Sequence, residues 1–313
     1  MREETLFTIE TPYRQPLAVK GWYFGSSAHK TLAVMGALRG NEIQQMYICA
    51  KLIQTFAKLE QDHLLAPECG ILVVPCADPF SMNVGRRFWA ADNTDINRMF
   101  PGYDKGETTQ RVAARIFESL QGYQYGVQMA SMFLPGKYLP HLRVIKTDYF
   151  SPEQARIFGL PYVLVRDPQP YDTTTLNYNW QIWDTQAVSL YTGETETVDQ
   201  VAADRAVQAV LRCLAHLGLY QGQADSGQPC TVISESTLCN IHASRGGLLV
   251  CRSQPGDRVA AGDLLAEIQD PCTGAVLEQL SSQADGRVFF VHRPSLINGH
   301  DVAFRILPGE YTL

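Results

Sequence analysis

The chain has 313 residues, of which 45% are hydrophobic and 19% are charged, and its formal net charge is −6. This composition is ordinary for a globular protein and argues against disorder, and the length suits two domains. Lys and Arg are scattered, so there is no basic patch of the kind that binds nucleic acid. No apolar run approaches the ~20 residues that cross a bilayer, so we expect no membrane span. The acidic start of the chain does not resemble a signal peptide.

The eight cysteines form no C-x-x-C motif, and several lie in apolar strand or helix patterns. A buried free cysteine behaves as a small hydrophobic residue. We therefore expect a reduced, cytoplasmic protein without disulfides, and no zinc site made of cysteines.

Apolar patterns predict strands and helices in alternation through the first two thirds of the chain. Residues 5–25 alternate apolar and polar side chains, as edge strands do. An apolar run over 31–35 reads as a buried strand, and helical spacing of apolar residues follows over 42–62. A second buried strand is predicted over 69–75. In open α/β sheets ligands bind where strands end and helices begin, so the turn Met-Gly-Ala-Leu-Arg-Gly-Asn-Glu at 35–42 is the first candidate site.

The next segment, 76–102, is long, polar and rich in Arg and aromatic residues, which is typical of a functional loop. After it, the pattern predicts a helix over 107–120 and a short helix over 151–158, then a strand over 161–165. A polar stretch over 172–184 precedes a strand over 187–193 and a helix over 197–219.

A Gly/Ser/Gln-rich linker at 221–229 divides the chain into an α/β domain, residues 1–222, and a β-domain, residues 230–313. The second part consists of short apolar runs separated by Gly- and Asp-containing turns. A carrier domain of the biotin or lipoate type needs a lysine to modify, and no lysine follows Lys146. A structural or assembly role is therefore expected for this domain.

Three segments resemble one known family: Arg39-Gly-Asn-Glu42, Asp95-Ile-Asn-Arg-Met-Phe-Pro-Gly102 and Leu139-Pro-His-Leu-Arg143. They are similar to motifs of the succinylglutamate desuccinylase/aspartoacylase family, which is related to the zinc carboxypeptidases. The resemblance implies a mixed, mostly parallel sheet flanked by helices, followed by a small all-β domain of the biotinyl/lipoyl-like type. It also implies zinc-dependent hydrolysis of the amide bond of an N-acyl amino acid.

The zinc site of the family is altered here. Of the residues that the family uses, Glu42 alone stands at its expected place. Arg39 replaces one histidine ligand, Ala130 stands in the slot of the other, and Tyr191 replaces the glutamate that acts as general acid and base. The alternative that a shifted alignment brings Glu194 or Glu196 to the position of this glutamate stays open.

A guanidinium has no lone pair for a metal and stays charged. We therefore expect Arg39 to take the place of zinc and to pair with Glu42, because a buried carboxylate without a cation is costly. The first hypothesis is a metal-free member, with no cofactor, that binds a small carboxylate-bearing molecule such as an acyl amino acid. The substrate-binding candidates are Arg39, Arg87, Asn97, Arg98 and Gln128, and the catalytic candidates are Glu42, Tyr191 and His141.

Two alternatives stay open. The chain could be an active hydrolase that retains zinc in a rearranged site, for which the carboxylates and imidazole near the same sheet edge are candidates: Glu42, Asp92, Asp95, His141 and Glu194. It could instead be a scaffold with a vestigial pocket. Homo-oligomerisation is left open.

Overall fold

The computed structural model describes residues 1–10, 13 and 16–309. One edge of its large sheet is an antiparallel pair, β1 (Arg2–Ile9) and β2 (Leu17–Gly25), and β2 continues the sheet by pairing with β4 (Gly70–Cys76). The predicted edge strands are confirmed over the described residues.

The centre of the sheet is parallel, in the order β4, β3 (Leu32–Ala37), β5 (Tyr125–Met129) and β8 (Gln186–Gly193). Every residue of β3 is buried. A strand covered by helices on both faces needs apolar side chains on both sides, which explains why the sequence shows a continuous apolar run and not an alternation.

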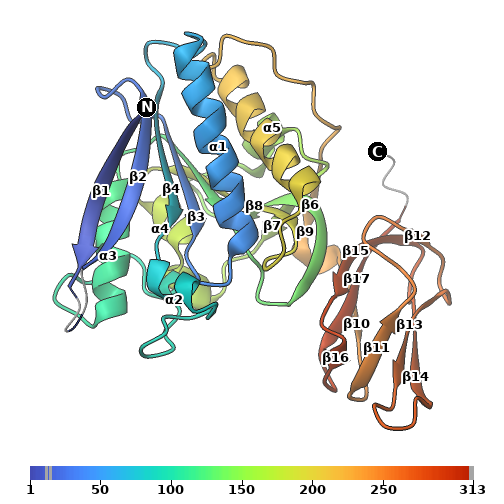
Figure 1. The fold of residues 1–313 in the computed structure, drawn as a ribbon. Coiled ribbons are helices and arrows are strands. Elements are labelled where there is room, and N and C mark those ends of the chain that lie inside the picture. Colours follow the sequence, from blue (N-terminus) through green and yellow to red (C-terminus); the bar gives the residue numbers. More distant parts are fainter. Residues whose placement is uncertain (11–12, 14–15, 310–313) are drawn as a thin grey trace.

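Helices cover both faces of this parallel part (Figure 1). On one face α1 (Ile43–Gln61) packs against α5 (Gln200–His216), and they share one apolar core with the sheet. On the other face α3 (Thr108–Leu120) and α4 (Leu176–Ile182) enclose a second core. Helix α4 forms in the stretch that the sequence marks only as polar, because its buried amides find hydrogen-bond partners. For example, the Gln181 amide donates to the Ala187 carbonyl at 3.0 Å.

The long loop over 76–102 contains two short helices, α2 (Pro79–Asn83) and the 3-10 helix η1 (Ile96–Arg98). The Asp78 carboxylate caps α2 by accepting from the Ser81 backbone N–H at 2.9 Å, and Asp95 caps η1 in the same way. Two further 3-10 helices, η2 (Pro152–Phe158) and η3 (Pro170–Thr174), follow in the chain. Loop 76–102 is thus a structured segment whose fold is fixed by local caps.

Beyond β8 the sheet continues through β6 (Gly136–Ile145), which is antiparallel to β8 and carries β7 (Tyr162–Arg166) on its other side. The C-terminal segment joins this edge twice. Its first strand, β9 (Thr231–Ser234), is parallel to β7, and β15 (Gly286–His292) is antiparallel to β6.

The C-terminal strands form a second lobe beside the α/β part (Figure 1). Strands β10 (Cys239–His242), β12 (Arg258–Val259) and β17 (Val302–Pro308) extend the large sheet beyond β15, and a 3-10 helix, η4 (Glu235–Thr237), follows β9. A separate antiparallel sheet has the order β14-β13-β11-β16, with bounds β11 (Gly247–Cys251), β13 (Leu264–Gln269), β14 (Val276–Ser281) and β16 (Leu296–Ile297).

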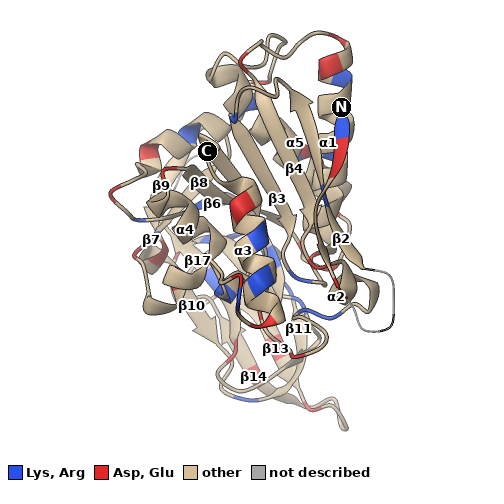
Figure 2. Ribbon diagram, turned by 90° about the vertical axis from the view of Figure 1, so that its left-hand side faces the viewer, with Lys and Arg blue, Asp and Glu red and all other residues tan. Residues whose placement is uncertain are grey.

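The predicted mixed α/β sheet with flanking helices and the antiparallel C-terminal β region are confirmed. All eight cysteines are free. Among the described residues, no helix is both long and apolar enough to cross a membrane. Basic and acidic residues are interspersed on the outward side of α3, as the scattered charge of the sequence predicts (Figure 2).

Candidate functional site

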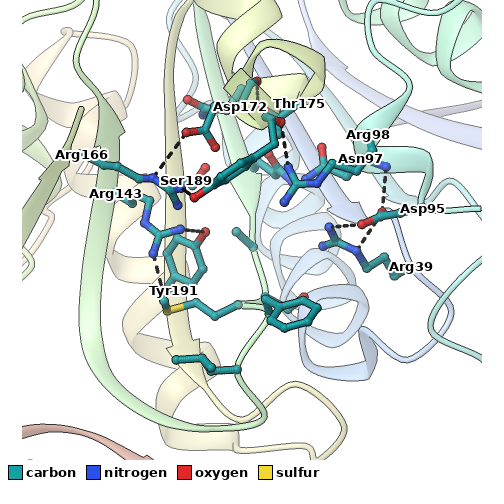
Figure 3. A pocket seen from close by; sticks show the side chains of 18 of the residues that line it. Arg39, Asp95, Asn97, Arg98, Arg143, Arg166, Asp172, Thr175, Ser189 and Tyr191 are labelled. Atoms are coloured by element: carbon teal, nitrogen blue, oxygen red, sulfur yellow. Dashed lines mark hydrogen bonds and ion pairs between the residues drawn. The ribbon is translucent and has the colours of Figure 1, made fainter. Parts of the chain in front are cut away.

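A pocket of about 520 Å³ opens where the central parallel strands end. Its floor is a row of residues paired across the sheet: Gln128 on β5 stands opposite Ser189 on β8, which stands opposite Arg143 on β6. Loop 76–102 forms one side of the pocket, and residues from the C-terminal region reach into the other. The 3-10 helix η3 contacts both sides, through Arg98 and through Arg166. Figure 3 shows arginines on both sides of it.

Arg39 and Glu42 lie in the turn after β3 and form a buried ion pair. The Arg39 Nη1 atom is 3.0 Å from the Glu42 Oε1 atom, and the two side chains are 6% and 1% exposed. The other Glu42 oxygen accepts from the backbone N–H groups of Leu38 at 2.8 Å and Arg39 at 3.1 Å, and Ser131 Oγ donates to Oε1. The predicted Arg39–Glu42 pair is confirmed.

A second carboxylate, Asp95, holds the other edge of the Arg39 guanidinium. Nε and Nη2 of Arg39 donate to the two Asp95 oxygens at 3.0 and 2.9 Å, which is the bidentate geometry that favours Arg over Lys (Figure 3). Burial by itself would lower the pKa of Arg39, but Glu42 and then Asp95 outweigh it and raise the pKa. Arg39 is thus a fixed cation between two carboxylates.

The residues expected to hold a carboxylate lie on the same side of the pocket. Asn97 accepts from the Leu176 backbone N–H at 3.0 Å through Oδ1, and Arg98 donates to the Tyr171 carbonyl at 3.3 Å. Arg87 has no ion-pair partner among the described residues, and its buried Nε has no hydrogen-bond partner there. Burial, and then repulsion from Arg39, lowers the pKa of Arg87. An anion would relieve both effects.

The catalytic candidates separate in the structure. Tyr191 lines the pocket, and its hydroxyl accepts from Arg143 Nη1 at 3.2 Å. His141 is fully buried behind it, stacked on the Tyr191 ring with 4.9 Å between centroids. Its Nδ1 bonds to the Leu139 carbonyl at 2.8 Å, and burial lowers its pKa to about 3. His141 is therefore a neutral residue of the pocket wall and does not reach the pocket surface.

A second cluster, which sequence reasoning did not find, lies on the opposite side. Its arginines are Arg143 on β6, Arg166 on β7 and Arg305 on β17, and Glu235 of η4 joins them. Of these, Arg143 alone belongs to a motif segment visible in the sequence. Arg305 and Glu235 reach the pocket only because β9 and β15 pair with β7 and β6.

Residues 28–217 match the family model described as the succinylglutamate desuccinylase/aspartoacylase catalytic domain. The chain belongs to this family. It is 23% identical over 243 residues to N-alpha-acetyl-L-2,4-diaminobutyric acid deacetylase of Halomonas elongata, an alignment that covers 74% of this chain and 70% of that protein.

Solved structures of the desuccinylase/aspartoacylase family share the fold. A succinylglutamate desuccinylase from Silicibacter sp. TM1040 superposes with a TM-score of 0.82 at 19% identity, over 97% of this chain and 94% of that one. The product-bound ectoine utilization protein EutE (DoeB) from Ruegeria pomeroyi gives 0.78 at 19% identity, over 93% and 89%. The family consists of deacylases, so a deacylase fold is established for this chain.

The residues that the resemblance assigns to the zinc positions of the desuccinylase/aspartoacylase family are Arg39 and Ala130, whose side chains are not of the types that bind zinc. Arg39 fills the space beside Glu42 with a positive charge, and Ala130 offers no ligand atom. Within residues 1–10, 13 and 16–309 no group of three His, Cys, Asp or Glu side chains is placed to hold a metal ion.

Three other carboxylates, named as candidates for the metal site or for the general acid and base, are engaged elsewhere. Glu194 pairs with Arg293 at 2.8 Å, and Glu196 accepts from the Asn41 amide at 2.7 Å. Asp92 accepts from the Thr94 backbone N–H at 2.9 Å within its own turn. None of the three lines the pocket. Tyr191, by contrast, lines the pocket.

Proposed function

We propose that this chain is a metal-free member of the desuccinylase/aspartoacylase family whose pocket binds a small carboxylate-bearing molecule, such as an acyl amino acid. The observation that carries the proposal is the placement of Arg39 between Glu42 and Asp95. In this arrangement the guanidinium of Arg39 supplies the positive charge that a metal ion would supply.

Electrostatics explains why the pair and a metal exclude each other. A divalent cation at Glu42 would lie within a few ångströms of the Arg39 guanidinium, which donates three charged hydrogen bonds to Glu42 and Asp95 and cannot lose its proton. Moving Arg39 away would leave Asp95 without its cation. A rearranged zinc site would therefore require the ion pairs of Arg39 with Glu42 and with Asp95 to break before the metal could bind Glu42.

The ligand-binding side of the proposal rests on Arg87, Asn97 and Arg98. Their positively charged and amide groups converge on one side of the pocket, and Arg87 has unused donors. Arg–carboxylate pairs are short, charge-assisted and directional, so this group suits the carboxylate of an amino acid. The name of the Halomonas relative, a deacetylase of an acetylated amino acid, agrees with this ligand class.

Glu42 accepts from two backbone N–H groups, Arg39 and Ser131, and this full set of donors makes it a structural anchor in our proposal. Tyr191 supplies a pocket hydroxyl that can donate a proton. The scaffold alternative predicts a collapsed pocket with Arg39 turned to solvent, whereas Arg39 is buried and the pocket is open.

Metal content tests the proposal. Untagged protein purified without chelator, loaded with zinc and desalted, is analysed by mass spectrometry beside the double variant Arg39→His/Ala130→His, which restores the family's ligand types. We expect far less than one zinc per wild-type chain and close to one in the double variant. Stoichiometric zinc in the wild type would refute the proposal, and failure of the variant to gain zinc would show that the backbone geometry has also changed.

We also propose that the C-terminal β region is a structural module of the biotinyl/lipoyl-like type, separated from the α/β domain at 222–230. Its antiparallel sheets and the absence of lysine after Lys146 support a role other than a carrier. A cytoplasmic location is proposed as well, supported by eight free cysteines.

A further inference from the structure

One stretch of the pocket lining is apolar and has no role in holding a carboxylate. It follows β5 and precedes β6, and every residue from Ala130 to Leu134 lines the pocket. Apart from Ser131 the side chains of this stretch are apolar, and we call them the apolar wall: Ala130, Met132, Phe133 and Leu134. Ligand pockets are built mostly from such side chains, with a few polar groups that fix the orientation of the ligand. The wall therefore suits the uncharged part of a ligand.

Phe133 is the member of the apolar wall that is open to solvent. It is 79% exposed, whereas Ala130 and Met132 in the same stretch are 6% and 8% exposed. A single exposed apolar residue is ordinary on a protein surface, but an exposed aromatic ring beside other apolar side chains of a pocket is typical of a binding site. Covering this ring with an apolar group removes apolar area from water, which favours binding.

The backbone is held in place on both sides of Phe133. Before it, the Ala130 carbonyl accepts from the side-chain amide of Gln45 at 3.1 Å. After it, the Pro135 carbonyl accepts from the backbone N–H of Arg293 at 3.3 Å. The wall thus has a fixed position without a ligand, and such preorganisation lowers the entropic cost of binding.

The apolar wall begins beside the residues proposed to hold the carboxylate. Strand β5, which leads into the wall, is the parallel neighbour of β3, and neighbouring strands lie about 4.8 Å apart. Ser131 donates a hydrogen bond to Glu42, the partner of Arg39. On the same side, the Arg87 guanidinium lies 5.6 Å from the centroid of the Phe88 ring. A ligand held here by its carboxylate therefore has the wall as its neighbour.

The uncompensated positive charge lies at this end of the pocket. The three arginines of the second cluster already pair with Glu235 or Asp172, at 3.0 to 3.4 Å. Arg87 and Arg98 line the pocket and have no carboxylate partner within the part of the chain that the structure describes. One anionic group on the ligand therefore satisfies the free arginines, and its other end can be uncharged.

We propose that the apolar wall is the subsite for the acyl group of the ligand, and that this acyl group is an uncharged hydrocarbon chain larger than acetyl. The cavity volume of about 520 Å³ agrees with such a ligand, since pockets of ~300–1,000 Å³ hold drug-sized molecules. Phe133 is then a residue that determines specificity, because an acidic acyl group would lose its water against apolar side chains. This inference rests on the proposed function, in which Arg87, Asn97 and Arg98 hold the carboxylate.

Calorimetric titration with N-acylglycines tests the subsite. One series lengthens the acyl group from acetyl through butyryl to hexanoyl. A second comparison, N-butyrylglycine against N-succinylglycine, keeps the chain length and adds a terminal carboxylate. A third, N-acetylnorleucine against N-acetylglycine, moves the apolar chain from the acyl group to the amino-acid side chain. The variant is Phe133→Ala, and its matched control is Tyr149→Ala, which removes an aromatic ring that is 57% exposed outside the pocket.

We expect N-hexanoylglycine to bind the wild type at least 10-fold more tightly than N-acetylglycine, since each buried methylene contributes about 3- to 4-fold. N-butyrylglycine should bind more tightly than N-succinylglycine. Phe133→Ala should reduce the advantage of the hexanoyl group to about 3-fold or less without changing the binding of N-acetylglycine, and Tyr149→Ala should change neither. The heat-capacity change on binding should become more negative as the acyl chain lengthens, because more apolar surface is buried.

The contrary results have different meanings. If N-acetylglycine binds but longer chains gain nothing, if N-succinylglycine binds more tightly than N-butyrylglycine, or if Phe133→Ala leaves the advantage intact, the apolar subsite is refuted and the proposed function stands. A gain for N-acetylnorleucine without one for N-hexanoylglycine would refute the assignment of the wall to the acyl group. If no N-acylglycine binds the wild type at all, the proposed function is refuted, and the subsite with it.

Discussion

Removing Arg39 should destabilise this protein strongly, and removing its partner as well should restore part of the loss. In Arg39→Met, Glu42 stays 1% exposed without a cation. Breaking a buried ion pair by removing one partner costs about 3–5 kcal/mol, whereas replacing both partners by uncharged groups is often close to neutral. The double variant Arg39→Met/Glu42→Gln should therefore be more stable than Arg39→Met alone.

The hydrogen bonds that remain place the loss near the lower end of that range. After the substitution, Glu42 still accepts from the Leu38 and Arg39 backbone N–H groups and from Ser131. We expect a loss of about 3 kcal/mol, which lowers Tm by about 5 °C in a chain of this size. The exposed Arg115–Glu118 pair is the control, since Arg115→Ala should cost about 1 kcal/mol or less.

Differential scanning calorimetry and urea unfolding of the wild type, both single variants, the double variant and the control complete a double-mutant cycle. Two outcomes would refute the reasoning. In the first, Arg39→Met costs no more than Arg115→Ala; in the second, the losses of Arg39→Met and Glu42→Gln simply add in the double variant. Either result would mean that the guanidinium does not compensate a buried charge.

Three further predictions concern ligand binding and pH. Arg87→Ala and Arg98→Ala should each weaken monocarboxylate binding about 10-fold or more, because each removes a charged hydrogen bond. Calorimetric titration of the wild type and both variants with a monocarboxylate measures the change. His141→Phe should flatten the acid side of the stability curve. The pKa of His141 is about 3 in the folded state and ~6.5 in the unfolded state, so below about pH 6 only the unfolded wild type takes up this proton. The stability of the wild type therefore falls by up to about 1.4 kcal/mol per pH unit as the pH drops. Urea unfolding between pH 7 and 4 measures this slope. Glu235→Gln should also flatten the acid side of the stability curve. The pKa of Glu235 is lowered in the folded state, so its carboxylate stabilises the fold above pH ~4.3, and this stability is lost as the pH falls through the folded-state pKa. An unchanged slope would contradict the ionised state of Glu235.

Much of the α/β part could be predicted because its signals are local. The continuous apolar run at 31–35 predicts a strand buried on both faces, and the turn that follows it carries Arg39 and Glu42 three residues apart. At that separation the two side chains can meet without any help from the rest of the fold, so their pairing was predictable from chemistry alone. Helix α4 was missed, because three of its five buried residues are amides, which make the stretch look polar in the sequence.

The rest of the site depends on which strands pair with one another. Apolar periodicity in the sequence predicts that a strand is buried, but it does not predict which strand lies beside it. Asp95 was named as a candidate metal ligand, but it holds Arg39, 56 residues away, because η1 lies beside the turn after β3. Glu235 and Arg305 belong to a segment that the sequence separates by a linker, yet the pairing of β9 with β7 and of β15 with β6 brings them to the pocket. The sequence by itself determined the family and the layered α/β fold, since these follow from residue identity and local spacing. Only the tertiary structure decided that the pocket has arginines on two opposite sides, because that arrangement depends on long-range strand pairing.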